Sequence, residues 1–204
     1  MIKFLRHLKR IISINNSIVN INNRNIKIAV NDWMRNPKKA ETKYGHISNW
    51  NTSQVTTMKK LFFKFPLLNE PIGDWDVSNV TDMSYMFRND GIGSTFNQPI
   101  GNWDVSKVTT MEEMFCGATS FNQDISTWNV SSVNSLKAMF YGATSFNQTI
   151  CNWDLSNVKN ISFMFYCAIS FNQNLSNWNI KNINNSFSFR FNTPNWLLPK
   201  PKKL

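Results

Sequence analysis

Side chains that could do chemistry recur at one position of this chain, directly after a regularly spaced tryptophan. They are Asp76, Asp104, Asn129, Asp154 and Asn179. If the tryptophans lie on successive turns of a repeat, these side chains form a column, which we call the Asp/Asn ladder. Carboxylates in neighbouring turns repel one another, and a cation or a partner's basic group would relieve that repulsion. The alternative is a solvated ladder whose amides bond between turns.

Catalysis is not predicted from this ladder. A glycosidase-type carboxyl pair needs a cleft and a raised pKa on one member, and a regular open ladder supplies neither. The histidines, His7 and His46, are far apart in the sequence, and no C-x-x-C motif occurs, so zinc-ligand spacing is absent. We therefore expect a protein that is not an enzyme, with no cofactor and no metal site.

The tryptophans define a repeat. Six of the eight tryptophans stand at positions 50, 75, 103, 128, 153 and 178, with spacings of 25, 28, 25, 25 and 25 residues. A fixed period of about 20 to 50 residues is typical of repeat arrays. Three extra residues fall within Arg88–Thr95, after which the pattern resumes. We expect this insertion to project as a loop, and Arg88, Asn89 and Asp90 are candidate partner contacts because loops on a rigid scaffold often bind.

Each unit combines two periodicities. Trp128 and Val130 alternate as in a short strand, whereas Val133, Leu136 and Phe140 follow the spacing of a helix with one buried face. A Gly-Ala-Thr-Ser turn follows at 142–145. The sequence therefore predicts an α/β repeat solenoid of about five to six coils, each a strand plus a short helix.

The repeated strings resemble a known family. FNQPIGNWDVSKVTTMEEMF and FNQDISTWNVSSVNSLKAMFYGATSFNQ are similar to the BspA-type leucine-rich repeats, also catalogued as a mycoplasma-type 25-residue repeat of unknown function. The likeness covers roughly residues 44–183. It implies a leucine-rich-repeat-like solenoid, and some bacterial members are surface proteins that adhere to host matrix proteins. It supports the fold more strongly than any function.

Four segments are predicted. Residues 1–25 form a basic N-terminal extension, 26–43 a helical N-cap, 44–183 the BspA-type solenoid, and 184–204 a C-terminal cap with a basic tail. The N-cap is expected to cover the apolar edge of the first coil, with a separate recognition helix as the alternative. The extension is open to three interpretations: a solvated tail, an amphipathic helix at a membrane surface, or an organelle-targeting peptide.

Charge and cysteines bound the environment. The net charge is +10, divided as +8 over residues 1–43, −3 over 44–180 and +5 over 181–204. A slightly acidic body argues against specific nucleic-acid binding, which favours a basic stripe. The basic N-terminus could still make weak contact with a membrane surface. Cys116, Cys151 and Cys167 are expected as free thiols, which with the lack of a clear signal peptide favours an intracellular location, a cell-surface location being the alternative.

These observations favour one function. We expect a non-enzymatic protein–protein interaction scaffold that binds a partner of unknown identity along the strand face. The candidate contacts are the Asp/Asn ladder and the insertion. The alternative is a surface or membrane-associated adhesin of the BspA type.

Overall fold

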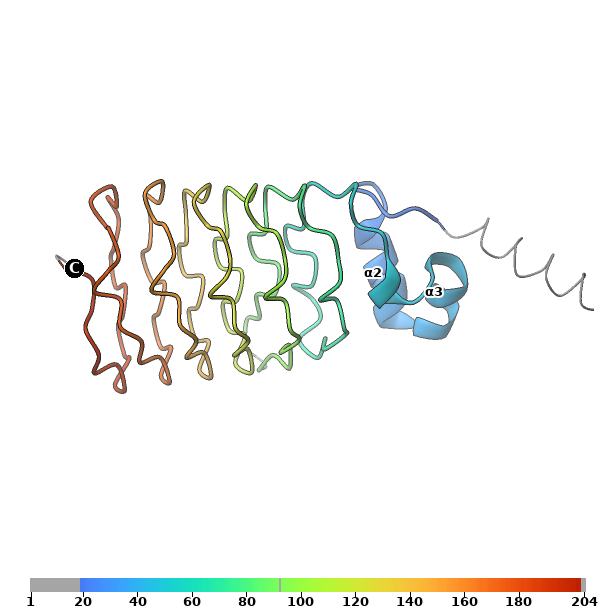
Figure 1. Cartoon of the computed structure of the whole chain (residues 1–204). Helices are drawn as coiled ribbons and strands as arrows, with labels where there is room; N and C mark the ends of the chain where they lie inside the picture. Colours follow the sequence, from blue (N-terminus) through green and yellow to red (C-terminus); the bar gives the residue numbers. More distant parts are fainter. Residues whose placement is uncertain (1–18, 92, 203–204) are drawn as a thin grey trace, which may run out of the picture.

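A stack of coils forms most of the molecule (Figure 1). The computed structural model describes residues 19–91 and 93–202, and each tryptophan-containing unit is one coil of the stack. Isolated parallel bridges join one residue of each coil to the next. The bridged residues are Thr57, Asp82, Thr110, Ser135, Asn160 and Asn185. Their separations repeat the tryptophan spacing, so the sequence repeat is also the structural repeat.

The predicted α/β repeat solenoid is wrong. Within the described residues the helices are α2 (Ile26–Arg35), α3 (Pro37–Tyr44) and the 3-10 helix η1 (Ile47–Asn49), all before the first coil. The coils contain turns and single-residue bridges, without a strand or a helix in their described parts. Neither a coil of strand plus short helix nor a leucine-rich-repeat-like description fits this backbone.

The segment predicted to be a helix carries the contacts between coils instead. Alternate amides donate to the next coil, as Leu136 N does to Asn160 O at 2.9 Å and Ala138 N to Ser162 O at 2.8 Å. The intervening amides donate within their own coil to the carbonyl three residues earlier, as Met139 N does to Leu136 O at 3.2 Å. A chain of such turns places apolar residues three apart, as a helix does, so the spacing alone could not separate the two.

A left-handed residue interrupts each coil in this segment. Its φ is 51–61° in all six coils, and none of the six residues is glycine. They are Lys60, Tyr85, Glu113, Ala138, Phe163 and Ser188. An α-helix and an extended strand both need negative φ, so this position ends either structure within a few residues. The segment predicted to be a strand, Trp128–Val130, is likewise bounded by turns at both ends.

The core is built from columns of identical side chains. Phe87, Phe115, Phe140 and Phe165 stack through the coils with ring centroids 5.5, 5.8 and 5.7 Å apart. We call these residues the buried phenylalanine column. From Trp75 to Trp178, each tryptophan of the repeat donates its indole N–H to a carbonyl of the preceding coil, as from Trp128 Nε1 to Ile100 O at 3.1 Å. These contacts join neighbouring coils, so each coil depends on its neighbours for stability.

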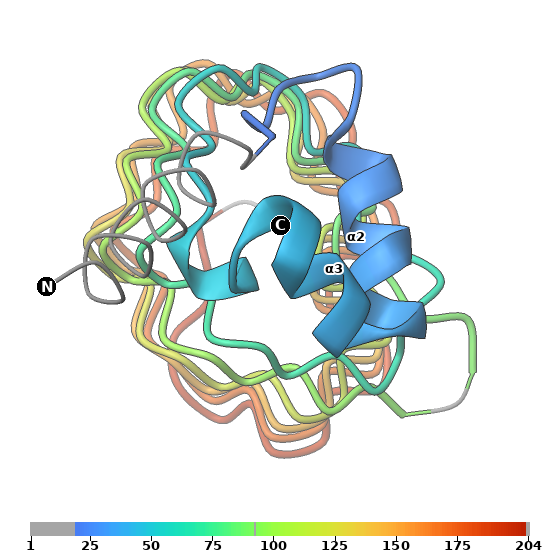
Figure 2. The same ribbon diagram turned by 90° about the vertical axis from the view of Figure 1, so that its right-hand side faces the viewer.

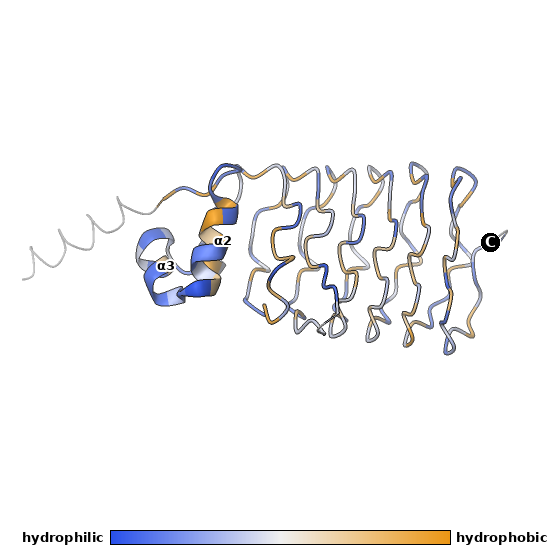
Figure 3. Ribbon diagram, turned by 180° about the vertical axis from the view of Figure 1, so that it is seen from behind, coloured by the Kyte–Doolittle hydropathy of each residue, from blue (hydrophilic) through white to orange (hydrophobic). Residues whose placement is uncertain are grey.

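Two helices cover the N-terminal end of the stack, where Figure 2 shows α2 and α3 lying across the first coils. The apolar residues of α2, namely Ile26, Ala29, Val30 and Trp33, form one helical face and are buried. Asn36 separates the helices, and its side-chain Oδ1 accepts a hydrogen bond from Lys39 N at 3.1 Å. α2 ends just before Asn36, and Pro37 is the first residue of α3. Figure 3 shows that α3 is mostly hydrophilic. None of the helices within the described part of the chain is long and apolar enough to cross a membrane.

The coil pattern continues beyond residue 183 to the end of the stack. Phe165 N donates to Phe189 O at 2.9 Å, and Cys167 N to Phe191 O at 2.9 Å. Trp196 is buried and packs edge-on against Phe171, with ring centroids 4.8 Å apart. Residues 184–196 thus complete the last coil. Residues 1–18 of the predicted basic extension lie outside the described residues.

Candidate partner-binding surface

The Asp/Asn ladder is exposed, and each of its five side chains accepts a hydrogen bond within its own coil. Asp76 Oδ1 accepts from Ser78 N at 3.0 Å and from Ser78 Oγ at 2.7 Å. The amides of Ser106, Ser131, Ser156 and Lys181 make the equivalent bond to the other four members. These are Asx turns, in which a side-chain oxygen fixes the next two residues of the backbone. The ladder therefore has a structural role that an asparagine fills as well as an aspartate.

Hydrogen bonding also explains the ionisation of the ladder. Hydrogen bonds from Ser78 lower the pKa of Asp76, because they stabilise the carboxylate. Hydrogen bonds from Ser106 lower the pKa of Asp104 in the same way. A general acid would need the opposite shift. Asp76 and Asp104 are thus ionised at neutral pH.

Amide bonding between coils occurs at a different position, in the repeated Phe-Asn-Gln string. Asn122 N donates to Asn97 Oδ1 at 2.9 Å, and Asn147 N donates to Asn122 Oδ1 at 2.9 Å. Asn172 N continues the series with Asn147 Oδ1 at 2.8 Å. The recurrence of this string follows from its role in joining the coils.

The insertion begins with an ion-paired arginine. Arg88 Nη2 lies 2.7 Å from Asp90 Oδ1, and Arg88 Nη1 pairs with Glu113 of the next coil. The guanidinium carbon also lies 5.6 Å from the ring centroid of Tyr85. Asn89 N donates to Cys116 O at 2.8 Å, which ties the base of the insertion to the next coil. Figure 2 shows the green insertion projecting outside the outline of the coils.

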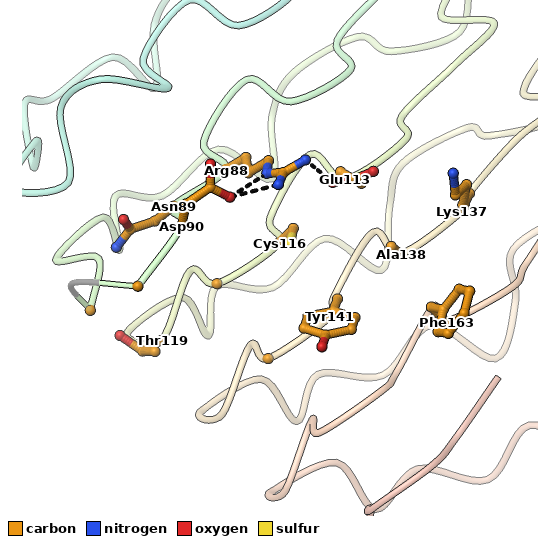
Figure 4. A pocket seen from close by; sticks show the side chains of 14 residues that line it. Arg88, Asn89, Asp90, Glu113, Cys116, Thr119, Lys137, Ala138, Tyr141 and Phe163 are labelled. Atoms are coloured by element: carbon orange, nitrogen blue, oxygen red, sulfur yellow. Dashed lines mark hydrogen bonds and ion pairs between the residues drawn. The ribbon is translucent and has the colours of Figure 1, made fainter. Parts of the chain in front are cut away.

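A hollow of about 590 Å³ lies beside the insertion (Figure 4). Arg88, Asn89 and Asp90 form one side of it, so the structure brings these three predicted contacts together. The members of the Asp/Asn ladder do not line it. Gly91 and Gly93 of the insertion also line it. The rest of its lining comes from the next coils and consists of Glu113, Cys116, Gly117, Thr119, Lys137, Ala138, Tyr141, Gly142 and Phe163.

A column of side chains at equivalent positions in successive coils runs through the hollow. We define the outer column as the residues at equivalent positions Arg88, Cys116, Tyr141, Tyr166 and Phe191. Tyr141 stacks on Tyr166 with centroids 4.7 Å apart, and Tyr166 stacks on Phe191 at 5.1 Å. Tyr141 is 37% exposed and Phe191 is 60% exposed. The outer column therefore carries an aromatic surface from the hollow to the last coil.

The three cysteines are free thiols with different surroundings. Cys116 is buried in the floor of the hollow, and burial raises the pKa of its thiol to about 11. Cys151 and Cys167 are half-buried. Since a nucleophilic cysteine needs a lowered pKa, the environment of Cys116 is that of a packing residue.

The residues that form the hollow beyond the insertion were not predicted as contacts from the sequence. Cys116 and Tyr141 stand at the outer-column position, and Ala138 stands at the left-handed position. The sequence signal that could have identified them is residue variation. The residue types at these positions change from coil to coil, while the buried columns keep theirs. Within the described residues, no group of three or more His, Cys, Asp or Glu side chains is placed to hold a metal ion.

Comparison with known proteins identifies a family. No curated protein and no solved structure matches the chain significantly. A family described as "Mycoplasma protein of unknown function, DUF285" matches residues 8–93, 29–126 and 90–196. These overlapping matches span most of the chain, and their repetition agrees with the repeat in the sequence. The chain therefore belongs to the DUF285 family of mycoplasma proteins of unknown function.

Proposed function

We propose that the chain is a non-enzymatic scaffold that binds a protein partner along the outer column and the hollow. The observation that carries this proposal is the aromatic stack of Tyr141, Tyr166 and Phe191, in which Tyr141 and Phe191 are exposed and which continues from a hollow of about 590 Å³. Aromatic residues are enriched at protein interfaces, and exposed apolar patches mark interaction sites. The binding surface is thus proposed beside the insertion, and the Asp/Asn ladder is the second candidate.

The charged groups of the hollow support binding over catalysis. Arg88 is paired with Asp90 and Glu113, so both carboxylates already have a partner. No histidine lines the hollow, and its thiol has a raised pKa. A general base or nucleophile would need a free group with a pKa near the working pH. A role without bound cofactor, metal or specific nucleic acid fits this set of groups.

Affinity capture with three baits tests the proposal. The first bait is the intact chain, the second carries Tyr141→Ser and Phe191→Ser, and the third carries Asp76→Asn and Asp104→Asn. We expect the same protein to be captured by the first and third baits and to be lost from the second. Capture by the second bait but not the third would move the binding surface to the Asp/Asn ladder.

The resemblance to BspA-type repeats supports a second candidate, a surface or membrane-associated adhesin. This role uses the same aromatic surface and differs in the location of the protein. Fractionation of source cells, with and without residues 1–25, separates the two candidates. Recovery of the intact chain at the cell surface, with loss on removal of residues 1–25, would favour the adhesin. Recovery inside the cell in both cases would favour the intracellular scaffold.

A further inference from the structure

The hollow is a gap in the outer column. Large side chains occupy this column at Arg88, Tyr141, Tyr166 and Phe191, whereas Cys116 is small. A second small residue, Ala138, stands where the adjacent coil has Phe163. In Figure 4, Cys116 lies between Arg88 and Tyr141, and Ala138 and Phe163 lie on the opposite side of Cys116 from Asn89. The missing side-chain volume of two neighbouring positions therefore creates the space.

The space has the dimensions of one further ring in the stack. Coils joined by backbone bridges are about 4.8 Å apart, so Arg88 and Tyr141 belong to coils separated by about 10 Å. A planar group halfway between them would lie at stacking distance from each. Tyr166 covers one face of Tyr141, at 4.7 Å between centroids and an interplanar angle of 2°. The other face of Tyr141 is therefore the one that borders the gap.

Arg88 is held in place on the opposite side. Its Nε and Nη2 contact Asp90, and its Nη1 pairs with Glu113. These bonds lie in the plane of the guanidinium. Its carbon lies 5.6 Å from the ring centroid of Tyr85 and 5.9 Å from that of Phe63, so the face turned away from these rings is the one left for stacking. A guanidinium face attracts an aromatic ring, and the attraction is stronger where water is excluded. An aromatic ring in the gap would therefore contact Tyr141 on one side and a fixed cation on the other.

One charge at the hollow lacks a partner. Lys137 lines the hollow, and its ammonium group makes no ion pair or hydrogen bond with the residues at 19–91 and 93–202. Arg88, by contrast, already has two acidic partners. An acidic group on the incoming molecule would complete the pairing at Lys137. A carboxylate fits better than a phosphate, because Asp90 and Glu113 already place two negative charges beside the hollow.

We propose that the gap above Cys116 binds an aromatic side chain of a protein partner, with an adjacent acidic residue of that partner paired to Lys137. This inference rests on the proposed function and names the chemistry of the partner. The aromatic group would serve as the buried anchor of the interface, since a few such anchors carry most of the binding energy of typical interfaces. The exposed stack of Tyr141, Tyr166 and Phe191 would contact the partner around the anchor.

Capped dipeptides test the chemistry without an identified partner. The probes are acetyl-Trp-Asp-amide, its aliphatic control acetyl-Leu-Asp-amide and its neutral control acetyl-Trp-Asn-amide. The readout is the NMR shift of the Gly117 and Gly142 amides, which border the hollow. We expect saturable binding of the first probe, with a dissociation constant on the order of 1 mM, because a ligand this small can gain only limited binding energy. The aliphatic probe should bind at least about tenfold more weakly, and the neutral probe about threefold more weakly.

Two substitutions at one position separate filling of the gap from loss of its lining. Cys116→Tyr places a ring in the gap, whereas Cys116→Ala leaves it open. We expect Cys116→Tyr to abolish binding of acetyl-Trp-Asp-amide and Cys116→Ala to change it less than about twofold. The melting temperatures of both variants report whether the coils remain folded. If Cys116→Tyr fails to fold, Tyr141→Ala serves instead, and loss of binding is expected because the stacking face is removed.

Several outcomes would overturn the proposal. They are unchanged binding by folded Cys116→Tyr, equal affinity for the aliphatic probe, and tighter binding of adenosine monophosphate, which would indicate a nucleotide site. A dimer of the intact chain that Cys116→Tyr converts to a monomer would make a second copy the occupant. If a chain with Cys116→Tyr still captures the partner protein, the proposed anchor site in the gap is wrong, while the proposed scaffold function stands. Failure of all three capture baits, with dipeptide binding intact, overturns the proposed scaffold function alone.

Discussion

The buried phenylalanine column and the outer column occupy successive positions in the coils, and they differ in how their residues vary. The buried column has Phe87, Phe115, Phe140 and Phe165, whereas the outer column has Arg88, Cys116, Tyr141 and Tyr166. Inside the stack, an identical ring in every coil keeps the packing distance nearly constant. Outside, the backbone stays regular while the side chain is free to change. The repeat therefore separates the residues that hold the coils together from those that give the surface its chemistry.

Alanine substitutions at two successive positions test this separation with the largest expected effect. Phe140 is 0% exposed, so Phe140→Ala should lower the free energy of unfolding by about 3–5 kcal/mol through lost burial and a cavity. Tyr141→Ala should lower it by no more than about 1.5 kcal/mol, the contribution of one exposed stacking contact. Urea unfolding followed by tryptophan fluorescence measures both values. Equal losses would mean that the outer column also holds the coils together.

Two glycines in adjacent coils give a smaller contrast. Gly117 and Gly142 have φ of 70° and 63°, so alanine is strained at both. A Cβ at Gly117 would lie 2.1 Å from Asn89 O, whereas at Gly142 the nearest atom would be 3.9 Å away. We expect Gly142→Ala to cost about 1 kcal/mol from backbone strain alone. Gly117→Ala should cost about 1–2 kcal/mol more, because the base of the insertion must also move.

Thermal unfolding of the two glycine variants measures the difference. A matched loss of stability would show that Asn89 moves away without cost, and that the insertion is not packed against the coil that contains Gly117. Cys167 provides an internal reference, because it occupies the same position two coils after Gly117 and has φ of 56°. The coil therefore accepts a side chain at this position where no insertion lies beside it.

The period of the fold could be read from the sequence, but its backbone could not. Tryptophan spacing identified the coils and located the insertion, and the apolar pattern identified Val133, Leu136 and Phe140, which are all buried. The pattern failed on backbone type because successive three-residue turns and a helix bury residues at similar spacing. The left-handed positions could not be predicted from residue type, because Glu113 and Ala138 stand where such φ values favour glycine.

The candidate site was predictable only in part, for a related reason. Arg88, Asn89 and Asp90 were identified because an insertion breaks the period. Cys116 and Ala138 belong to different coils, and each is an ordinary small residue when taken alone. They form a gap only because the stacking of coils places Arg88, Tyr141 and Phe163 around them. Aligning the repeats by the buried phenylalanine and comparing the next position would have revealed the gap.

The smallest expected effect concerns the Asp/Asn ladder, where Asp76→Asn tests whether the side chain serves chiefly as a turn acceptor. The pKa of Asp76 is lowered in the folded protein, so the carboxylate stabilises the fold above the unfolded pKa of about 3.8. That stabilisation is lost as pH falls through the folded pKa. Asparagine keeps the acceptor, as Asn129 does with Ser131 N at 3.1 Å, so stability at pH 7 should change by less than about 0.5 kcal/mol.

The variant should differ from the intact chain mainly in acid. Since asparagine does not titrate, the melting temperature of Asp76→Asn should fall less than that of the intact chain between pH 5 and pH 3, a range that brackets the unfolded pKa of about 3.8. Asp104→Asn should behave alike, because hydrogen bonds from Ser106 lower the pKa of Asp104 for the same reason. An identical acid profile for variant and intact chain would contradict the lowered pKa of Asp76. A large loss of stability at pH 7 would instead show that the negative charge of Asp76 itself stabilises the coil. The ladder position would then tolerate less variation in residue type than the outer column does.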